Sequence, residues 1–265
     1  WKGLVMGIAR LVKNPYVNRE AVAAPVFTSA VFHRSIPGFV PTPLREAETV
    51  AHRLGVRSVW VKDESMRLGM PAFKILGASW ATYRALMKHL GVPEHKKPTL
   101  AKLKKVVAES GRPLHVVAAT DGNHGRAVAR MAREIGLPCT IFVPQGTVKS
   151  RIKAIARNGC DVIVVDGNYD EAIDRARALI DDVHVCVQDT SWEGYSEVPR
   201  WIVDGYQTMM KEVIELIDEG LVPEPTVVVA QMGVGAFSAA AASAFAHRPA
   251  RLIVGSEPVV ADCIS

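Results

Sequence analysis

The amino-acid sequence predicts an α/β fold with two interleaved, open and mostly parallel twisted sheets that are flanked by helices. Segments with helical periodicity alternate with short apolar segments along most of the chain. The short segments are apolar throughout, which is typical of parallel strands covered on both faces. No linker marks a domain boundary, so we expect two domains between which the chain crosses more than once.

The elements follow one another in a regular order after a proline-rich start of about forty residues, which predicts loops. Helical spacing of apolar residues predicts helices at 44–54, 75–90, 126–135, 149–158, 169–180, 201–219 and 237–246. Apolar runs predict strands at 58–62, 114–119, 139–143, 161–165, 183–188, 226–230 and 252–255. We expect residues 1–86 and 181–265 to form a large domain and residues 87–180 a small one.

Composition excludes several classes of protein. The 265 residues are 49% hydrophobic and 22% charged, and the net charge of +5 comes from interspersed basic and acidic residues. This charge pattern argues against nucleic-acid binding. No segment of the sequence is long and apolar enough to predict a membrane span. The four cysteines form no CxxC pair, which favours free thiols in the cytoplasm. Because the chain starts at Trp1 and stops just after a strand-like segment, we expect further sequence at both ends.

Lys74 is the first residue whose surroundings point to chemistry. It stands between apolar neighbours at the start of a predicted helix. Desolvation and a helix N-terminus both lower the pKa of a lysine, which would free its amine for Schiff-base formation. A lysine that extends from an apolar surface into solvent gives the same pattern and is more common. Lys74 by itself therefore does not distinguish a catalytic lysine from a surface lysine.

A polar turn, Thr120–Gly125, follows the predicted strand at 114–119. Its two glycines let the backbone approach a flat ligand, and Asp121 and Asn123 place polar groups where strands of α/β sheets end and ligands bind. An Asx turn that caps the next helix explains the same residues equally well. His124 has no second ligand residue at metal-binding spacing, so we expect no metal site.

A glycine-rich turn between a predicted strand and a predicted helix forms a second candidate. Its backbone amides and the positive end of the helix dipole together suit a phosphate group. The residues concerned are Gly233, Val234, Gly235, Ala236 and Phe237. The turn is neither a dinucleotide fingerprint nor a Walker loop. A tight turn that allows close helix packing remains the alternative.

The third candidate is the loop 187–195, which follows another strand. Its nine residues include two carboxylates, two hydroxyls and two aromatic rings, with Asp189 directly after Gln188. Loops of this composition often line active sites. The capped start of the following helix would account for the same residues.

The order of these features along the chain indicates the function more strongly than any one feature does alone. A lysine that opens a helix, an asparagine-bearing turn and a glycine-rich phosphate turn resemble the fold-type-II, tryptophan-synthase-like family of pyridoxal-phosphate-dependent enzymes, over nearly the whole chain. Within this family, the sequence most resembles the diaminopropionate ammonia-lyases. The resemblance is carried by Phe32-His33, Pro41-Thr42-Pro43-Leu44, Lys62-Asp63-Glu64-Ser65, Arg67, Ala72-Phe73-Lys74, Thr120–Gly125, Gln188-Asp189-Thr190, Trp192-Glu193-Gly194-Tyr195 and Asp262-Cys263.

The chain departs from the family pattern in two places. It ends before the family's usual C-terminus, which completes the large domain and supplies the polar side chain facing the pyridine nitrogen. That residue is therefore not identified. The glycine turn also has fewer glycines than the serine and threonine dehydratases of the same fold, as in the diaminopropionate enzymes. The dehydratases usually carry Ser where Asp121 stands here, which favours the diaminopropionate enzymes.

The resemblance implies a homodimeric lyase that converts 2,3-diaminopropionate to pyruvate and ammonia with pyridoxal 5'-phosphate as cofactor. Lys74 would hold the cofactor covalently, the glycine-rich turn would bind its phosphate, and Asn123 would face the ring's 3-oxygen. Thr120, Asp121 and Asp189 would contact the small amino-acid substrate. The alternatives are a serine/threonine dehydratase and a non-catalytic binding protein of the same fold.

Asp121 and Asp189 would also be catalytic, together with Lys74. A carboxylate attracts the ammonium of a β-amine and trades protons with it, whereas a hydroxyl leaving group needs no such partner. In the family, the two matching carboxylates are implicated in proton abstraction from opposite enantiomers of the substrate. The resemblance assigns Asp121 to the D-isomer.

Overall fold

The computed structural model describes residues 12–120, 122–250 and 252–258. Its helices are α1 (Thr28–His33), α2 (Glu48–Leu54), α3 (Lys74–His89), α4 (Leu100–Ser110), α5 (Asn123–Ile135), α6 (Lys149–Ala156), α7 (Tyr169–Arg177), α8 (Glu197–Asp218) and α9 (Ala236–Phe245). Its strands are β1 (Leu44–Glu46), β2 (Trp60–Lys62), β3 (His115–Ala119), β4 (Cys139–Pro144), β5 (Asp161–Val165), β6 (His184–Cys186), β7 (Val227–Gln231) and β8 (Leu252–Ser256).

The largest sheet is parallel and has the strand order β5-β4-β3-β6. Alternate residues of β3 enter two different cores: Val116 and Ala118 pack with α5, while Val117 and Ala119 pack with α7. The sheet is therefore covered on both faces, which explains why its central strands are apolar throughout. Strands β7 and β8 form a second parallel pair, and β1 and β2 form an antiparallel one. The predicted α/β fold with mostly parallel sheets is confirmed.

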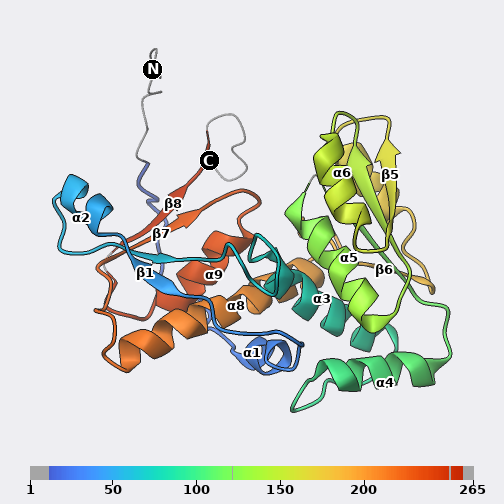
Figure 1. Cartoon of the computed structure of the whole chain (residues 1–265), viewed down its shortest axis with the longest axis horizontal. Helices are drawn as coiled ribbons and strands as arrows, with labels where there is room; N and C mark the ends of the chain where they lie inside the picture. Colours follow the sequence, from blue (N-terminus) through green and yellow to red (C-terminus); the bar gives the residue numbers. More distant parts are fainter. Residues whose placement is uncertain (1–11, 121, 251, 259–265) are drawn as a thin grey trace.

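Helix α3 lies between the two parts of the molecule. Figure 1 shows α5, α6, β5 and β6 on one side of it, and α8, α9, β7 and β8 on the other, and α3 packs against both α5 and α8. Strand β6 pairs with β3, so the chain still belongs to the larger sheet after residue 180. The division into a large domain (1–86 and 181–265) and a small one (87–180) stays a prediction.

Three local predictions were wrong. The segment Leu44–Glu46 forms β1 instead of the first turn of a helix, because it pairs antiparallel with β2. The proline-rich start contains the short helix α1. Helix α4 was missed because its lysines dominate the sequence, although Leu100 and Leu103 are buried beneath them. In each case contacts distant in sequence, or one narrow apolar face, decided the structure.

Two glycines set how closely α3 and α8 approach each other. A Cβ atom on Gly77 would lie 2.6 Å from Cε1 of Tyr206, and one on Gly205 would lie 2.5 Å from the carbonyl oxygen of Leu76. A side chain at position 77 would displace the side chains of Ile202 and Tyr206, and one at position 205 would displace the backbone of α3. The close crossing brings α8 directly against the first turns of α3.

Several residues of the resemblance form a buried ionic cluster, which joins the β2 region to α8. The guanidinium of Arg67 is fully buried and binds Glu64 and Glu212, with nitrogen–oxygen distances between 2.6 and 2.8 Å. Lys62 Nζ lies 2.6 Å from Glu212 Oε2, and Thr42 Oγ1 accepts a hydrogen bond from Arg67. These charges satisfy one another, so the structure gives this part of the motif a role in holding the fold.

Two further findings concern membrane-spanning helices and the state of the cysteines. None of the described helices is both long and apolar enough to cross a membrane. Cys139, Cys160 and Cys186 are free thiols, and Cys263 lies outside the described residues.

Candidate active site

Lys74 is the first residue of α3, and an aromatic cluster fixes that end of the helix. The ring of Phe73 packs edge-on against Tyr206 of α8, with a centroid separation of 5.0 Å. It also lies 4.8 Å from the ring of Phe237, in the first turn of α9. Phe73 therefore brings together the lysine and the glycine-rich turn, two of the predicted site segments.

Asp189 is the direct partner of Lys74. Lys74 Nζ donates a hydrogen bond of 3.1 Å to Asp189 Oδ2. The carboxylate is 7% exposed and the lysine side chain 25%, so the pair is largely shielded from water. Asp189 follows β6, at the carboxyl edge of the parallel sheet where ligands bind in α/β folds.

This pair reverses the pKa expected for Lys74. Burial by itself lowers the pKa, but the neighbouring Tyr206 and Asp189 side chains outweigh it and raise the value above its ordinary one. Burial would raise the pKa of Asp189, and the nearby His124 and Lys74 hold it below the usual range. The prediction of a lowered lysine pKa was wrong because a carboxylate 115 positions away supplies the compensating charge.

His124 is the second group beside Asp189. Its Nδ1 lies 3.8 Å from Asp189 Oδ2, and its Nε2 lies 2.8 Å from the carbonyl oxygen of Val187. A carbonyl only accepts, so Nε2 carries the proton and Nδ1 is the unprotonated nitrogen. Burial lowers the pKa of His124, which favours this neutral form. Within the described part of the chain, Nδ1 has no hydrogen-bond partner.

The turn before His124 is only partly described. Asp121 lies outside the described residues, so its predicted position has no structural account. The amide of Gly122 donates to Thr120 Oγ1 at 3.1 Å. Asn123 opens α5 with an exposed side chain. Because His124 contacts Asp189, this turn and the Lys74–Asp189 pair belong to one site.

Gln188 is a residue whose importance sequence reasoning missed. Its Oε1 accepts a hydrogen bond of 2.9 Å from the amide of Ala119, and its Nε2 donates to Asp189 Oδ1 at 3.4 Å and to the hydroxyl of Tyr169 at 3.2 Å. This fully buried amide therefore links the ends of β3 and β6 and orients Asp189. The sequence placed Gln188 in a family motif and at the polar end of an apolar strand, but neither signal predicted its hydrogen bonds.

The glycine-rich turn has the form of an anion site. Gly235 precedes α9 with a φ of +83°, a conformation that favours glycine. Gly233 has open space where a side chain would stand. The first amides of a helix lack partners within it, and no acidic residue occupies the first turn of α9. The turn can therefore accept a phosphate group on its backbone amides.

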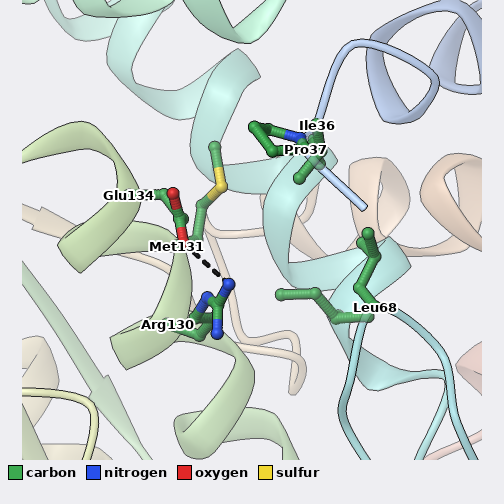
Figure 2. Close-up of a pocket in the computed structure, with 7 residues that line it drawn as sticks. Ile36, Pro37, Leu68, Arg130, Met131 and Glu134 are labelled. Atoms are coloured by element: carbon green, nitrogen blue, oxygen red, sulfur yellow. Dashed lines mark ion pairs between the residues drawn. The ribbon is translucent and has the colours of Figure 1, made fainter. Parts of the chain in front are cut away.

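One small hollow lies elsewhere and has a different character. Figure 2 shows it between the end of α1, Leu68 and α5, beside the Arg130–Glu134 ion pair of 2.8 Å. Its volume of about 10 Å³ is close to the minimum for a single water molecule. It is too small for a cofactor, and Lys74 and Asp189 do not line it. Across the described ranges, no three His, Cys, Asp or Glu side chains form a group that could hold a metal.

The geometry suits a small phosphorylated aldehyde. Three kinds of group converge around Phe73 and Asp189: an amine, the first amides of a helix, and two buried polar atoms, His124 Nδ1 and the Tyr206 hydroxyl, that have no hydrogen-bond partner among the described residues. Residues 36–265 match the family model of pyridoxal-phosphate-dependent enzymes, so the chain belongs to that family.

Individual relatives agree with this assignment. The chain is 34% identical to a diaminopropionate ammonia-lyase of Salmonella typhimurium over 264 residues, which cover 97% of this chain and 63% of the relative. The structure is similar to that of the Escherichia coli diaminopropionate ammonia-lyase in apo form, with a TM-score of 0.77 and 33% identity over 87% of this chain and 63% of that one. A bovine L-serine dehydratase/L-threonine deaminase is 28% identical over 203 residues, 75% of this chain and 50% of that protein.

The chain thus spans just under two thirds of the length of the diaminopropionate ammonia-lyases it matches. Membership of the family establishes pyridoxal phosphate as the class of cofactor. The residues that hold the cofactor and the substrate, and the reaction itself, are proposals for this chain.

Proposed function

We propose that this protein is a diaminopropionate ammonia-lyase, which splits 2,3-diaminopropionate into pyruvate and ammonia. The observation that carries the proposal is the shielded Lys74–Asp189 pair, which places a carboxylate beside the only predicted cofactor-carrying amine. A substrate with two amino groups benefits from such a carboxylate more than a hydroxy amino acid does. The similarity to named diaminopropionate ammonia-lyases supports the same substrate.

The cofactor residues we propose follow the site geometry. Lys74 would carry pyridoxal 5'-phosphate covalently, and the amides of Gly233, Val234, Gly235, Ala236 and Phe237 would hold the phosphate. Asn123 would face the ring's 3-oxygen from the start of α5, a position supported by the contact between its neighbour His124 and Asp189. The ring of Phe73 would pack near the cofactor, since it touches Phe237.

We propose that Thr120, Asp121 and Asp189 bind the substrate and that both carboxylates, with Lys74, move its protons. Pyridoxal phosphate supplies an electron sink that stabilises negative charge at Cα. Asp189 holds an ammonium in the cofactor-free protein, and the same oxygen can hold the β-ammonium of the substrate once Lys74 is engaged elsewhere. The ionised carboxylate would first accept the Cα proton and could then pass that proton to a β-amine, which would leave as ammonia; Gln188 keeps the carboxylate oriented.

Two alternative functions must be weighed against this proposal. A serine/threonine dehydratase of the same fold would use the same lysine and phosphate site, but Asp121 stands where those enzymes usually carry Ser. A non-catalytic binding protein would need neither the lysine nor the carboxylates. The lower identity and coverage with the bovine dehydratase also favour the diaminopropionate reaction.

The experiment that tests the function is pyruvate release from 2,3-diaminopropionate, L-serine and L-threonine, measured side by side with the reconstituted protein. We expect kcat/KM to be at least about tenfold higher for diaminopropionate, because a carboxylate that pairs with the second amine is worth more than about 1.4 kcal/mol. Faster release from serine or threonine would favour the dehydratase. A colourless protein that releases no pyruvate from any of them would favour the binding protein.

We further propose that the protein acts as a homodimer in the cytoplasm and that its large domain, 1–86 and 181–265, holds the cofactor against the small domain, 87–180. Size-exclusion chromatography with light scattering tests the dimer. Its mass would be twice that of the chain.

A further inference from the structure

Tyr206 is a buried side chain that the proposed reaction does not yet use. It belongs to α8, has no exposed surface, and its hydroxyl has no hydrogen-bond partner among the residues that the structure describes. A tyrosine hydroxyl in a protein interior normally finds a partner, because desolvation without one is unfavourable. The exception at Tyr206 lies beside the residue that we propose to carry the cofactor.

The surrounding residues hold this ring in one place. Phe73 packs edge-on against it, and Gly77 leaves the space that the ring edge fills, since a Cβ there would lie 2.6 Å from Cε1. Gly205, the residue before it, allows α8 to touch the backbone of α3. Glycines within helices are unfavourable for helix formation, and here Gly77 makes room for the ring while Gly205 makes room for the backbone of α3.

Lys74 is the polar neighbour of this hydroxyl. Its Nζ lies 6.0 Å from the centre of the Tyr206 ring, and the two side chains influence each other's pKa. Among the described residues, the other titratable groups at Lys74 are Asp189, which pairs with it, and His124, which is neutral and faces Asp189. Burial raises the pKa of Tyr206 to about 12, so its hydroxyl keeps its proton at neutral pH.

The protonation state of Lys74 determines what this hydroxyl can do. An ammonium has three N–H groups and no lone pair, so it cannot accept a hydrogen bond from a phenol. A Lys74 nitrogen without its extra proton has a lone pair. The hydroxyl then becomes the neighbouring donor, while Asp189 can only accept.

We propose that Tyr206 is a positioning residue that donates a hydrogen bond to Lys74 whenever the lysine nitrogen is uncharged. It would orient that nitrogen for covalent capture of the cofactor and for proton transfer after the substrate has displaced it. The inference extends the proposed function, because it depends on Lys74 as the cofactor lysine. Tyr206 acts through Lys74 and need not touch the substrate.

Tyr206→Phe is the test, because it removes only the hydroxyl. We expect the rate of covalent capture of pyridoxal phosphate and the kcat for diaminopropionate each to fall about tenfold, with KM little changed. Affinity for pyridoxamine phosphate, which has no aldehyde and cannot link to a lysine, should stay at the wild-type level. The urea midpoint of the cofactor-free protein should stay the same or rise, because a buried hydroxyl without a partner is removed.

Tyr83→Phe is the matched control. Tyr83 is equally buried, but its hydroxyl accepts a hydrogen bond of 3.2 Å from the amide of His95, far along α3 from Lys74. This variant should lower the urea midpoint and leave capture and kcat unchanged. Wild-type capture and kcat in Tyr206→Phe would overturn the inference, as would a matching loss of pyridoxamine phosphate affinity or of stability. Failure of the wild-type protein to capture pyridoxal phosphate would instead reject the proposed function itself.

Discussion

Lys74 Nζ and Asp189 Oδ2 lie 3.1 Å apart, although 115 positions separate the two residues in the sequence. The contact joins the first residue of α3 to the loop after β6. It places an amine and a carboxylate in one shielded site and keeps both charged in the cofactor-free protein. If Lys74 carries the cofactor as proposed, cofactor binding must replace this ion pair, which makes the pair a sensitive target for mutation.

Lys74→Ala should abolish covalent cofactor binding and nearly all turnover, because the described residues place no second lysine amine beside Asp189. Absorbance of the reconstituted protein and mass spectrometry after borohydride treatment measure the link. A reducible adduct in the variant at the wild-type level would refute the assignment. Lys88→Ala, at the exposed opposite end of the same helix, serves as the control and should retain the adduct.

Asp189→Asn should make the pH dependence of folding shallower at acid pH. The folded pKa of Asp189 is lowered, so its contribution to stability is present above the unfolded value of about 4 and is lost as pH falls through the folded value. We expect the variant to lose about 1.5–3 kcal/mol of unfolding free energy at pH 7, the usual worth of a hydrogen bond to a charged group. Urea unfolding of the cofactor-free protein between pH 3 and pH 7 measures both effects. Glu193→Gln, an exposed change in the same loop, should leave them unaltered.

The same variant should also change how the lysine responds to pH. The folded pKa of Lys74 is raised, so its pairing stabilises the protein below the unfolded value of about 10.4 and is lost as pH rises through the folded value. Removal of the Asp189 charge takes away one of the two neighbours that raise the lysine pKa against the effect of burial, so that pKa should fall. Covalent capture of pyridoxal phosphate should then become half-maximal at a lower pH than in the wild type. Identical pH profiles for the two proteins would mean that the carboxylate does not control the amine.

Gly235→Asp should weaken cofactor binding sharply, because it places a negative charge at the proposed phosphate site. Gly235 has a φ of +83°, so any side chain adds strain, and Gly235→Asn is the matched control. Asn and Asp both tolerate this conformation and differ in charge. We expect the Asp variant to bind pyridoxal phosphate at least about tenfold more weakly than the Asn variant, from a charge repulsion of about 1.4 kcal/mol. Equal affinities in a fluorescence titration would place the phosphate elsewhere.

Asp121→Asn and Asp189→Asn should have opposite stereochemical effects if each carboxylate serves one face of Cα. Asn keeps the shape of Asp but cannot act as a base near neutral pH. The Asp121 variant should lose mainly turnover of D-diaminopropionate and the Asp189 variant mainly that of the L-isomer, each by about a hundredfold. Pyruvate formation from each enantiomer measures the split. Equal losses of turnover with both isomers in both variants would leave the carboxylates an electrostatic role only. No loss of turnover in either variant would favour the serine/threonine dehydratase over the diaminopropionate enzyme.

Glu212→Gln tests the structural role of the ionic cluster. It would remove the carboxylate that pairs with Lys62 and leave Arg67, in a buried setting, with Glu64 as its single acidic partner among the described residues. We expect a loss of about 3–5 kcal/mol of unfolding free energy, the scale for breaking a buried ion pair. Urea denaturation measures it, and the cofactor affinity of the folded fraction should stay at the wild-type level. A cofactor defect without a loss of stability would show that the cluster belongs to the active site.

The sequence determined the fold class, most helices and strands, and the candidate segments around Lys74, Asp189 and the glycine-rich turn. These features depend on local periodicity and on turn residues, which a chain carries wherever it folds. The prediction failed at β1 and at α4, where strand pairing or a narrow apolar face decided the outcome. Asp121 and the division into domains stay predictions.

Only the tertiary structure decided the electrostatics of the site. The sequence indicated a desolvated lysine with a lowered pKa, and folding brought Asp189 and Tyr206 to it and raised that pKa instead. The roles of Gln188 and Tyr206 were equally hidden, since each depends on partners more than sixty residues away. The physical reason is that a charge or a hydrogen bond acts over a few ångströms in space, whatever the distance along the chain.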